Sequence, residues 1–561
     1  MKDVISEILL KAIKKEGVSL KKEEIEKFIE IPPSHEMGDY AFPCFFLAGK
    51  LKASPQTIAI KIRENIENYP KDFEDIQTSG PYINFFLDRR TMALNLIKEI
   101  KAAGDNYGRV KPNGKTVLVE FSSPNIAKPF GIGHLRSTII GNAIANLADF
   151  NGYKTIRFNY LGDWGTQFGK LIVGYKKYGD EAELKKDPIK HLLDIYVRVN
   201  KEENEDEARA WFKKLEDGDK EALRLWDKFK KLSLKDFEKI YNILGIKFDV
   251  YSGESMDNAQ MPKVIEELKA KKLLVQSEGA LIVDLSKYNL EVCLIQKSDG
   301  STIYAARDIA SAISRYNKYK FDKMVYEVGQ EQKLHFQQVF KVLELMGYSW
   351  AKNCVHADHG LYLGEDGKKF ATRKGKTIFM QDIIDETKKL AAQEIKVRFP
   401  KISDKELEKR AMKVAIAAIF YGDLKNNRTN DMVFNLNRFV SFEGDTGPYI
   451  LYSYARACSI LKKLKKQPKP QPLEELEDKE ILFVKKLSEF KDISSKAYEL
   501  LNPNLIANYA YQLSQVFNEF YHACPVINSS KEAFRIDLVV SFKQILKTSL
   551  YLLGIEPLEK M

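Results

Sequence analysis

The sequence has few cysteines and no long apolar run, and both absences exclude classes of protein. Only five cysteines occur in 561 residues, with no CxxC pair, which argues against a disulfide framework and against the usual structural zinc spacing. No stretch of about 18 uncharged apolar residues exists, and residues 1–20 have the pattern of an amphipathic helix and not of a signal peptide. We therefore expect a cytoplasmic protein with no membrane segment and no structural metal.

Charge of a single sign is also missing. The chain has 89 Lys and Arg against 78 Asp and Glu, so the net charge of +11 comes from a mixed surface that permits a polyanionic partner without demonstrating one. There is no internal repeat and no extended low-complexity tract, which excludes a solenoid. The chain has 561 residues, 44% of them hydrophobic, and is longer than a single hydrophobic core usually supports. This length suggests about three domains.

The first part of the chain predicts two different folds in succession. Residues 1–110 alternate helical patterns with turn-rich stretches, which favours a small N-terminal α+β domain. From residue 111 a continuous apolar run at 116–121, a helical stripe and a second strand-like run predict a strand, helix, strand unit. Residues 111–385 are therefore expected to form a doubly wound, Rossmann-like parallel sheet.

Two further segments complete the expected organisation, a multidomain α/β protein. A charged helical insertion is predicted near 181–300, most clearly at 181–240, with Trp211 and Trp226 as packing anchors. Strand signals nearly vanish after residue 385, so 386–561 is predicted to be an all-α helix bundle.

The most informative segment is a glycine-rich turn between the first predicted strand and its helix. Gly131 and Gly133 would let phosphates approach the backbone at a helix N-terminus, and His134 could donate to a phosphate oxygen. A dinucleotide fingerprint would need glycine where Arg136 stands, and a Walker loop would need glycine where Phe370 stands. The turn predicts a nucleotide site, with a plain helix-capping turn as the alternative.

The residues around this turn carry a family resemblance. The stretch EFSSPNIAKPFGIGH at 120–134 resembles arginyl-tRNA synthetases, in which a Ser-Pro-Asn-x-Ala-Lys-Pro element precedes the class I HIGH motif. One departure is that Gly131 stands where the first histidine of that motif is usual. Further blocks resemble the same family, namely LGDWGTQFG at 161–169, FDVYSGES at 248–255, YAARDIA at 304–310, DLKNNR at 423–428 and SFEGDTGPYILY at 441–452.

The resemblance implies an arginine pocket rich in hydrogen-bond acceptors. Its residues would be Glu120, Asn125, Tyr304, Asp308 and Gln332. Carboxylate and amide oxygens suit a guanidinium, which is a planar fork of five donors. Taken singly, Tyr304 could instead be a core residue, Gln332 a helix cap and Asp308 a surface charge.

The resemblance also implies an ATP site that spans two segments. The ATP-binding residues would be Lys128, Gly131, Gly133, His134, Thr372, Arg373 and Lys374. Four of these, Lys128, His134, Arg373 and Lys374, would stabilise the charge that develops on the departing pyrophosphate. Lys128 would replace the missing second lysine of the family's signature loop. The loop itself, at residues 370–375, could alternatively be a basic surface turn.

Two aromatic clusters are candidates for contact with tRNA. Tyr82, Asn84 and Phe85 lie in the N-terminal part, which resembles the family's additional tRNA-binding domain, and Tyr449, Tyr452 and Arg456 lie in the part that resembles the anticodon-binding domain. Exposed bases stack on such aromatics. Packing in the core explains Tyr82, Phe85 and the later tyrosines about as well.

The expected activity is arginine–tRNA ligation by a monomer with no permanent cofactor. Arginine would be activated by the Mg²⁺ complex of ATP to arginyl-adenylate and then transferred to the 2′-hydroxyl of the terminal adenosine of its tRNA. One rival is a class I synthetase for another amino acid. The other is an inactive paralogue that only binds RNA, which the glycine at position 131 motivates.

Overall fold

The computed structural model describes residues 1–202, 204–298, 304–364, 367, 379–464, 466, 468 and 471–561. The chain forms two compact units. The first consists of Met1–Gly104, Lys466–Ser488 and Glu519–Ser541, and the second of Asp105–Lys465, Glu489–Asn518 and Phe542–Met561.

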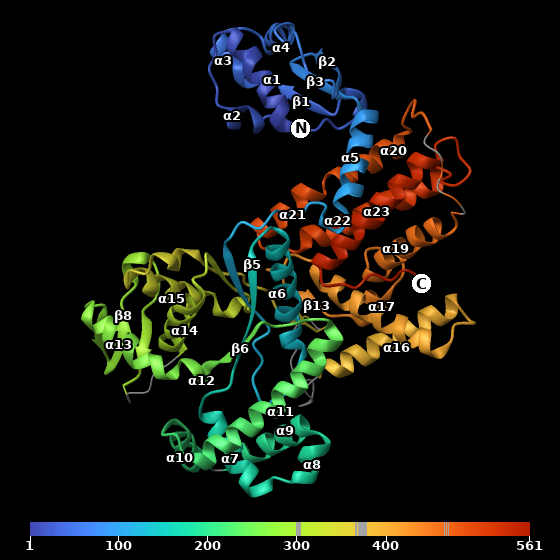
Figure 1. The fold of residues 1–561 in the computed structure, drawn as a ribbon. Helices are drawn as coiled ribbons and strands as arrows, with labels where there is room; N and C mark the ends of the chain where they lie inside the picture. The colour runs from blue at the N-terminus through green and yellow to red at the C-terminus, as the bar shows by residue number, and fades with distance from the viewer. Residues whose placement is uncertain are drawn as a thin grey trace. The chain divides into compact units, whose positions relative to one another are not determined.

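The first unit contains an antiparallel sheet with the strand order β1-β3-β2, and helices cover it (Figure 1). In α1 the buried residues Ile5, Leu9 and Ile13 recur every four positions, so one helix face joins the core around Phe42 and Phe85. The elements of this unit are α1 (Lys2–Lys15), α2 (Lys22–Glu26), η1 (His35–Met37), β1 (Tyr40–Pro43), η2 (Phe45–Leu47), α3 (Ala48–Leu51), α4 (Pro55–Glu64), β2 (Phe73–Ser79), β3 (Tyr82–Leu87), α5 (Arg89–Ala103) and α20 (Asp478–Ser488). The expected α+β fold is confirmed.

The second unit is built on a parallel sheet, and its strand order among the described residues is β11-β10-β4-β5-β6. The strands are β4 (Thr116–Glu120), β5 (Lys154–Leu161), β6 (Val250–Gly253), β10 (Lys323–Tyr326) and β11 (Cys354–His356). The chain winds one way from β4 to β6 and the other way from β4 to β11. The two directions meet between β4 and β10, which is where open α/β sheets bind ligands.

Helix α6 (Ile132–Phe150) follows β4 and lies beside the sheet (Figure 1). The predicted stripe that includes Leu135, Ile139 and Leu147 is buried, but the helix is buried on its other sides as well. A side chain at Gly141 would place its Cβ 2.1 Å from the Cβ of Phe121, so this glycine permits the close approach of helix and strand.

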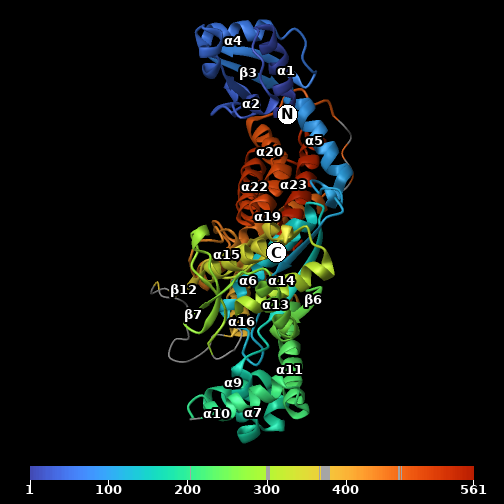
Figure 2. The ribbon, with the colours of Figure 1, turned by 90° about the vertical axis from the view of Figure 1, so that its left-hand side faces the viewer.

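The insertion is helical over a shorter range than 181–300. Its helices are α7 (Thr166–Tyr178), α8 (Glu181–Lys186), α9 (Pro188–Val199), α10 (Glu205–Glu216) and α11 (Lys220–Leu244). Helices α7, α9 and α10 gather around one end of α11 (Figure 2), and α8 contacts α9. Trp211 is buried, and Trp226 packs on Trp164 at a ring distance of 5.9 Å.

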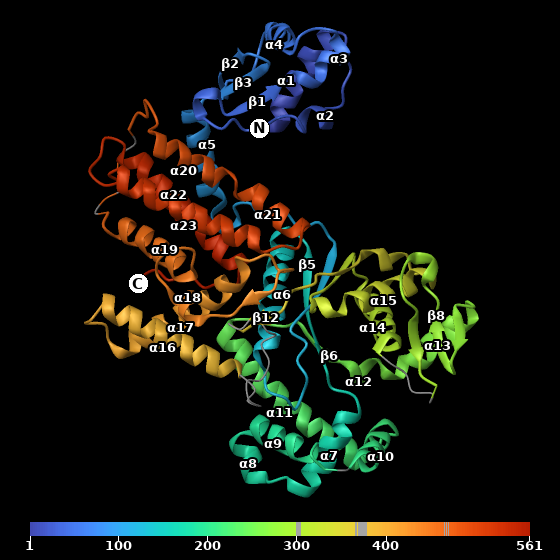
Figure 3. The same ribbon diagram turned by 180° about the vertical axis from the view of Figure 1, so that it is seen from behind.

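Beyond Leu244 the chain returns to the sheet as β6, so the predicted helical range is corrected there. The apolar runs after residue 270 then form a separate antiparallel sheet of β7 (Leu274–Ser277), β8 (Ala280–Val283) and β9 (Cys293–Gln296). Helices α13 (Met261–Ala270), α14 (Tyr304–Tyr319) and α15 (Lys333–Leu345) share its core (Figure 3). Short elements in this region are α12 (Glu254–Asp257), η4 (Asn258–Gln260), η5 (Ser286–Tyr288), η6 (Gln330–Gln332) and η7 (Ser349–Asn353).

The last part of the chain is helical, as predicted. It contains α16 (Met380–Arg398), α17 (Asp404–Leu424), α18 (Leu436–Val440), α19 (Gly447–Lys462), α21 (Phe490–Glu499), α22 (Asn504–Ala523) and α23 (Glu532–Leu552). A short parallel pair of β12 (Tyr362–Leu363) and β13 (Met432–Val433) precedes α18. Within the described ranges, every helix is too short or too polar to cross a bilayer.

Candidate active site

A cavity of about 360 Å³ opens where the sheet order reverses, at the carboxyl ends of β4 and β10. It is lined by Ser122, Ser123, Asn125, Ile132, Gly133, His134, Arg136, Ser137, Glu327, Val328, Gly329, Glu331, Gln332, His359, Gly360, Leu361 and Tyr362. The predicted glycine-histidine turn therefore lies in the wall of a cavity at the position where this fold binds ligands.

The turn between β4 and α6 holds a strained backbone. Ser122, Ser123 and Ala127 have φ values of 74°, 43° and 59°, a region that side chains other than glycine rarely adopt. Hydrogen bonds keep it there: the Ser122 N–H donates to Ser137 Oγ at 3.0 Å, and the Ala127 N–H donates to Ser233 Oγ at 2.8 Å. The strain fixes the path by which the chain enters α6.

His134 and Gly133 occupy the first turn of α6. Burial and the nearby Lys128 charge lower the pKa of His134 to about 4, so the imidazole is neutral at pH 7. Its Nδ1 atom is buried and has no hydrogen-bond partner among the described residues. A Cβ added at Gly133 would meet no atom of the described residues within 4 Å, so these residues leave room beside the backbone N–H groups of the helix start.

Two of the other predicted ATP-binding positions can be placed. Lys128 is half-buried, and its Nζ lies 5.4 Å from the centre of the Tyr196 ring. Gly131 is the N-cap of α6, in an extended conformation, and forms an antiparallel bridge with Phe379. The predicted Thr372, Arg373 and Lys374 lie outside the described residues.

Asn125 and Gln332 of the predicted arginine pocket line the cavity. Asn125 bridges to Gly162 at the end of β5, where a Cβ would lie 2.1 Å from Asn125 Oδ1. Glycine at 162 is therefore what lets Asn125 occupy its place. Gln332 precedes α15 at the N-cap position, but its side chain makes no capping hydrogen bond, so the alternative of a helix cap is not supported.

Glu120 has a different partner from the one expected. Its carboxylate is buried and forms an ion pair with Arg315 of α14, whose guanidinium also lies 4.4 Å from the centre of the Phe158 ring. Burial raises the pKa of Glu120, and Arg315 opposes that effect. The Glu120 carboxylate, which the sequence predicts to bind the arginine substrate, is thus already paired with a guanidinium of the chain itself, that of Arg315.

Asp308 and Tyr304 lie on α14. Asp308 Oδ2 is 2.5 Å from His335 Nε2, and the negative charge of Asp308 acts on Glu120, Glu254 and Asp257. Tyr304 is 68% exposed and so does not belong to the core.

Sequence reasoning missed two carboxyl groups of this cluster. Glu254 and Asp257 stand three residues apart on α12, inside the FDVYSGES block and just after it. Burial raises the pKa of Glu254 to about 7, although Arg307 lies 3.1 Å away, and burial also raises the pKa of Asp257. Their i, i+3 spacing was the available signal.

The N-terminal candidates for tRNA contact separate in the structure. Phe85 is fully buried and packs on Phe73, and Asn84 is 7% exposed, so the interpretation of Phe85 as a base-stacking residue is wrong. Alternation along β3 turns Phe85 toward the core. Tyr82 is half-buried beside the exposed Phe45, with ring centres 5.7 Å apart.

The three candidates on α19 lie together. The Arg456 guanidinium lies 4.9 Å from the centre of the Tyr452 ring and donates to Asn518 Oδ1 at 2.5 Å. Asn518 Nδ2 in turn donates to the Tyr449 hydroxyl at 2.9 Å. Tyr511 adds a further ring 5.6 Å from that of Tyr449, which the sequence pattern did not indicate.

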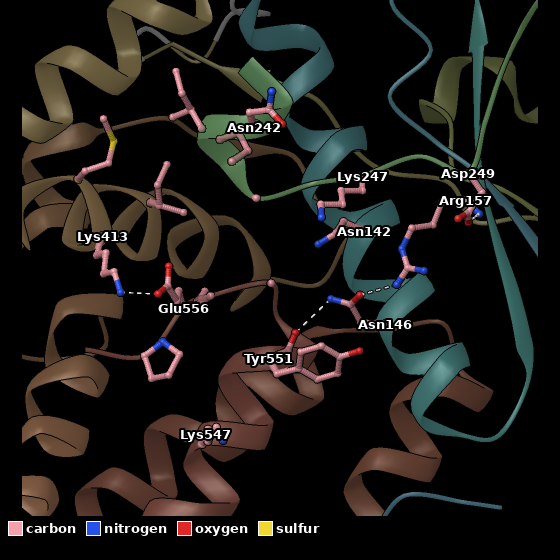
Figure 4. Close-up of a pocket in the computed structure, with 18 residues that line it drawn as sticks. Asn142, Asn146, Arg157, Asn242, Lys247, Asp249, Lys413, Lys547, Tyr551 and Glu556 are labelled. Atoms are coloured by element: carbon pink, nitrogen blue, oxygen red, sulfur yellow. Dashed lines mark hydrogen bonds and ion pairs between the residues drawn. The ribbon is translucent and has the colours of Figure 1, made fainter. Parts of the chain in front are cut away.

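A second cavity, of about 720 Å³, lies in the same unit at the other end of α6 (Figure 4). Asn146 of α6 lines this cavity and makes a hydrogen bond on each side of its amide group. Its Nδ2 donates to the Tyr551 carbonyl at 3.1 Å, and its Oδ1 accepts from Arg157 Nη2 at 2.8 Å. These contacts hold the C-terminal segment against α6.

A parallel sheet with a cavity at its switch point, a glycine-histidine helix start and a helical C-terminal part define a class I aminoacyl-tRNA synthetase fold. Comparison with known families agrees. The models described as "tRNA synthetases class I (R), catalytic domain", "Arginyl tRNA synthetase N terminal domain" and "DALR anticodon binding domain" match residues 96–436, 2–87 and 450–561.

Individual relatives narrow the assignment. An arginine–tRNA ligase of Clostridium perfringens is 45% identical over 559 residues, 98% of each chain. The solved arginyl-tRNA synthetase of Plasmodium falciparum is 28% identical with a TM-score of 0.81, over 99% of this chain and 98% of that one. The enzyme from Thermus thermophilus shares the fold at a TM-score of 0.81 and 24% identity, over 100% of both chains. The chain belongs to the arginyl-tRNA synthetase family.

Proposed function

We propose that the chain, whose family has arginine–tRNA ligase activity, works in two steps at the switch-point cavity. The arginine carboxylate attacks the α-phosphate of ATP, supplied with Mg²⁺ as substrate, and pyrophosphate leaves. The 2′-hydroxyl of the terminal adenosine of tRNA then attacks the activated carbonyl and releases AMP. Positioning and charge stabilisation drive both steps, and no side chain serves as a nucleophile.

The observation that carries the proposal is the neutral His134 in the cavity wall at the start of α6. A neutral imidazole keeps one N–H that can donate to a phosphate oxygen, and Lys128 places a positive charge nearby. Arg373 and Lys374 complete the charge stabilisation in this proposal, with Thr372, Gly131 and Gly133 as backbone and hydroxyl contacts.

An excess of negative charge around α14 supports arginine as the amino acid. Among the described residues, the carboxyl groups of Glu120, Glu254, Asp257 and Asp308 face the guanidiniums of Arg307 and Arg315, and Asp308 also faces His335. A substrate guanidinium supplies the missing positive charge. In this proposal Asp308 and Glu254 bind it, Tyr304, Asn125 and Gln332 orient the rest of the substrate, and Glu120 acts through Arg315.

The transfer RNA partner accounts for the remaining parts of the chain. We propose that Tyr82 contacts it from the N-terminal domain, residues 1–110, and that Tyr449, Tyr452 and Arg456 contact it from the helical domain, residues 386–561. The catalytic domain then covers 111–385. We further propose that the enzyme acts as a monomer in the cytoplasm.

The test is arginine-dependent exchange of pyrophosphate into ATP, with and without tRNA, together with charging of total tRNA by arginine, lysine or glutamate. We expect charging with arginine alone. His134→Ala should lower kcat by about 100-fold or more, because an aimed donor is lost. Unchanged kcat in this variant would contradict the assignment of His134.

Gly131 motivates the second candidate, an inactive paralogue that binds tRNA without charging it. A donor usual at that position is missing, since glycine has no side chain. Binding of tRNA with no charging of any amino acid by the unmodified chain would establish this alternative and overturn the first.

A further inference from the structure

A buried carboxylate and imidazole face each other in the wall of the switch-point cavity. Glu327 follows β10 and is 1% exposed, and His359 follows β11 and is 7% exposed. His359 Nδ1 lies 2.8 Å from Glu327 Oε1. Both residues line the cavity.

The backbone holds this pair rigidly. The Glu327 N–H donates to the Glu120 carbonyl at 2.9 Å, which extends the pairing of β10 with β4. Ser137 Oγ donates to the Glu327 carbonyl at 3.0 Å and thereby joins the pair to α6, the helix that begins at the glycine-histidine turn. The imidazole thus has a fixed place relative to Gly133 and His134.

The pair is poorly explained as a stabilising device. Glu327 Oε2 is buried without a hydrogen-bond partner among the described residues, and a buried carboxylate with one donor usually destabilises a fold relative to an apolar pair. Glu327 nevertheless lies directly beside His359. Burial disfavours the charged imidazole, but Glu327 outweighs that effect and raises the pKa of His359.

The geometry leaves one ring nitrogen for a ligand. Nδ1 is engaged by Glu327, so Nε2 is the atom of His359 that can serve the cavity, and no partner for Nε2 is seen in the described part of the chain. Glu327 itself is too buried to touch a ligand, so it acts through the imidazole. An imidazole held by a carboxylate in this way presents an N–H donor of fixed direction.

We infer that His359, held by Glu327, donates its Nε2 hydrogen to a phosphate oxygen of the bound nucleotide and supplies the donor that Gly131 lacks. The inference rests on the proposed function, since it requires ATP in this cavity. Lys128, the α6 N-terminus and the His359 N–H then surround one anion. Glu327 is the positioning residue, and no covalent step involves either side chain.

The first experiment compares nucleotide affinity in the full-length chain. His359→Phe should raise the KM for ATP by about tenfold, the effect of losing one charge-assisted hydrogen bond, and leave the KM for arginine within about twofold. His359→Gln, which retains a neutral donor, should lie between. Glu327→Gln should raise the KM for ATP severalfold, whereas Glu278→Gln, at an exposed turn outside the cavity lining, should not.

The second experiment tests replacement directly. Restoring a histidine by Gly131→His should lower the KM for ATP strongly in the His359→Phe background and only slightly in the unmodified chain. Equal effects in both backgrounds would show that the two positions serve different purposes and would overturn the inference.

Ligand-side measurements keep phosphate contact separate from base contact. Inhibition by pyrophosphate should weaken in His359→Phe while inhibition by adenosine stays unchanged; a parallel loss of adenosine binding would contradict the proposal. If the unmodified chain shows no exchange at all, the proposed function fails instead. Circular dichroism and Tm establish that each variant is folded, and Glu327→Gln with the pyrophosphate measurement decides the matter if His359→Phe is not.

Discussion

At the scale of single residues, burial changes the ionisation of the carboxyl cluster around α14, which consists of Glu120, Glu254, Asp257 and Asp308. Burial raises the pKa values of the first three. Glu254 is the member whose ionisation falls near physiological pH, because burial raises its pKa to about 7. Asp308 adds repulsion, and Arg307 at 3.1 Å only partly offsets these effects. Glu254 therefore changes its charge near neutral pH in the folded chain.

Arginine binding should follow that ionisation. Since a guanidinium binds the ionised carboxylate, the KM for arginine should fall by up to about tenfold as pH rises from about 6 to 8. Glu254→Gln should give a higher and flatter KM profile, whereas Glu278→Gln, at an exposed turn, should retain the slope. Steady-state exchange across this pH range is the measurement, and an unchanged slope in Glu254→Gln would contradict the assignment.

The same shift has a consequence for stability, with the opposite sign. The pKa of Glu254 in the folded chain lies above its ordinary value of 4.5, so the contribution of this group is lost as pH rises from about 4.5 through about 7. Arginine should reverse the loss. Thermal unfolding with and without arginine at pH 6 and 8 measures the difference, and ligand stabilisation equal at both pH values would be inconsistent with it.

At the scale of elements, two close approaches position the functional side chains. The turn after β4 bridges to the end of β5 through Asn125 and Gly162, and α6 approaches Phe121 at Gly141. Each contact depends on a glycine that lacks Cβ. The site is thus held by strand ends and a helix start, and small side chains there control its geometry.

Substitution of Gly162 should displace Asn125 without unfolding the sheet. In Gly162→Ala the new Cβ would lie 2.1 Å from Asn125 Oδ1, so the amide must move, and the KM for arginine should rise by about tenfold or more. Gly49→Ala, whose Cβ meets no described atom within 4 Å, is the matched control. Kinetics of pyrophosphate exchange measure the result. A normal KM for arginine in Gly162→Ala would show that Asn125 does not take part in arginine binding.

Asn146 should matter for stability and not for chemistry. Asn146→Ala removes one hydrogen bond to the Tyr551 carbonyl, which still accepts from the Gly554 N–H, and one from the Arg157 guanidinium, at a cost of about 1–3 kcal/mol in the free energy of unfolding. Asn242→Ala, at an exposed position in the lining of the same cavity, should change little. Denaturant unfolding compares the variants, and equal midpoints would mean that these hydrogen bonds add nothing.

At the scale of the whole molecule, the proposed function requires tRNA to reach both the switch-point cavity and the helical part of the chain. Arg456 and Tyr452 stack on one another, and Asn518 links Arg456 to Tyr449. The group offers rings and a guanidinium on one helix, which suits unstacked bases.

Loss of this group should weaken tRNA binding and leave ATP binding intact. Arg456→Ala should reduce affinity for arginine tRNA by about tenfold, measured by filter binding at fixed salt. Lys462→Ala, on the same helix with an exposed side chain, should have a smaller effect. Identical affinities for Arg456→Ala and the unmodified chain would exclude the α19 group from the tRNA interface.

The sequence by itself determined the order and type of the main elements and the location of the glycine-histidine turn at the start of α6. Residues 116–121 and the stripe from Leu135 to Leu147 encode a strand and a helix through their nearest neighbours, so both could be predicted. The family and its amino-acid substrate, arginine, could be predicted because the blocks that resemble the family are uninterrupted stretches of sequence. Local sequence could not show that the runs near 280 and 294 form their own antiparallel sheet, because periodicity does not specify a partner strand.

Only the tertiary structure decided which side chains remain available to ligands. It paired Glu120 with Arg315, almost 200 residues away, turned Phe85 into the core, and placed His359 against Glu327 in the cavity wall. Such pairings depend on strand order and burial, and the energy of a charge depends on its partners and its access to water. For that reason the reaction could be predicted from the sequence, whereas the side chains that remain unburied and free to bind ligands are known only from the fold.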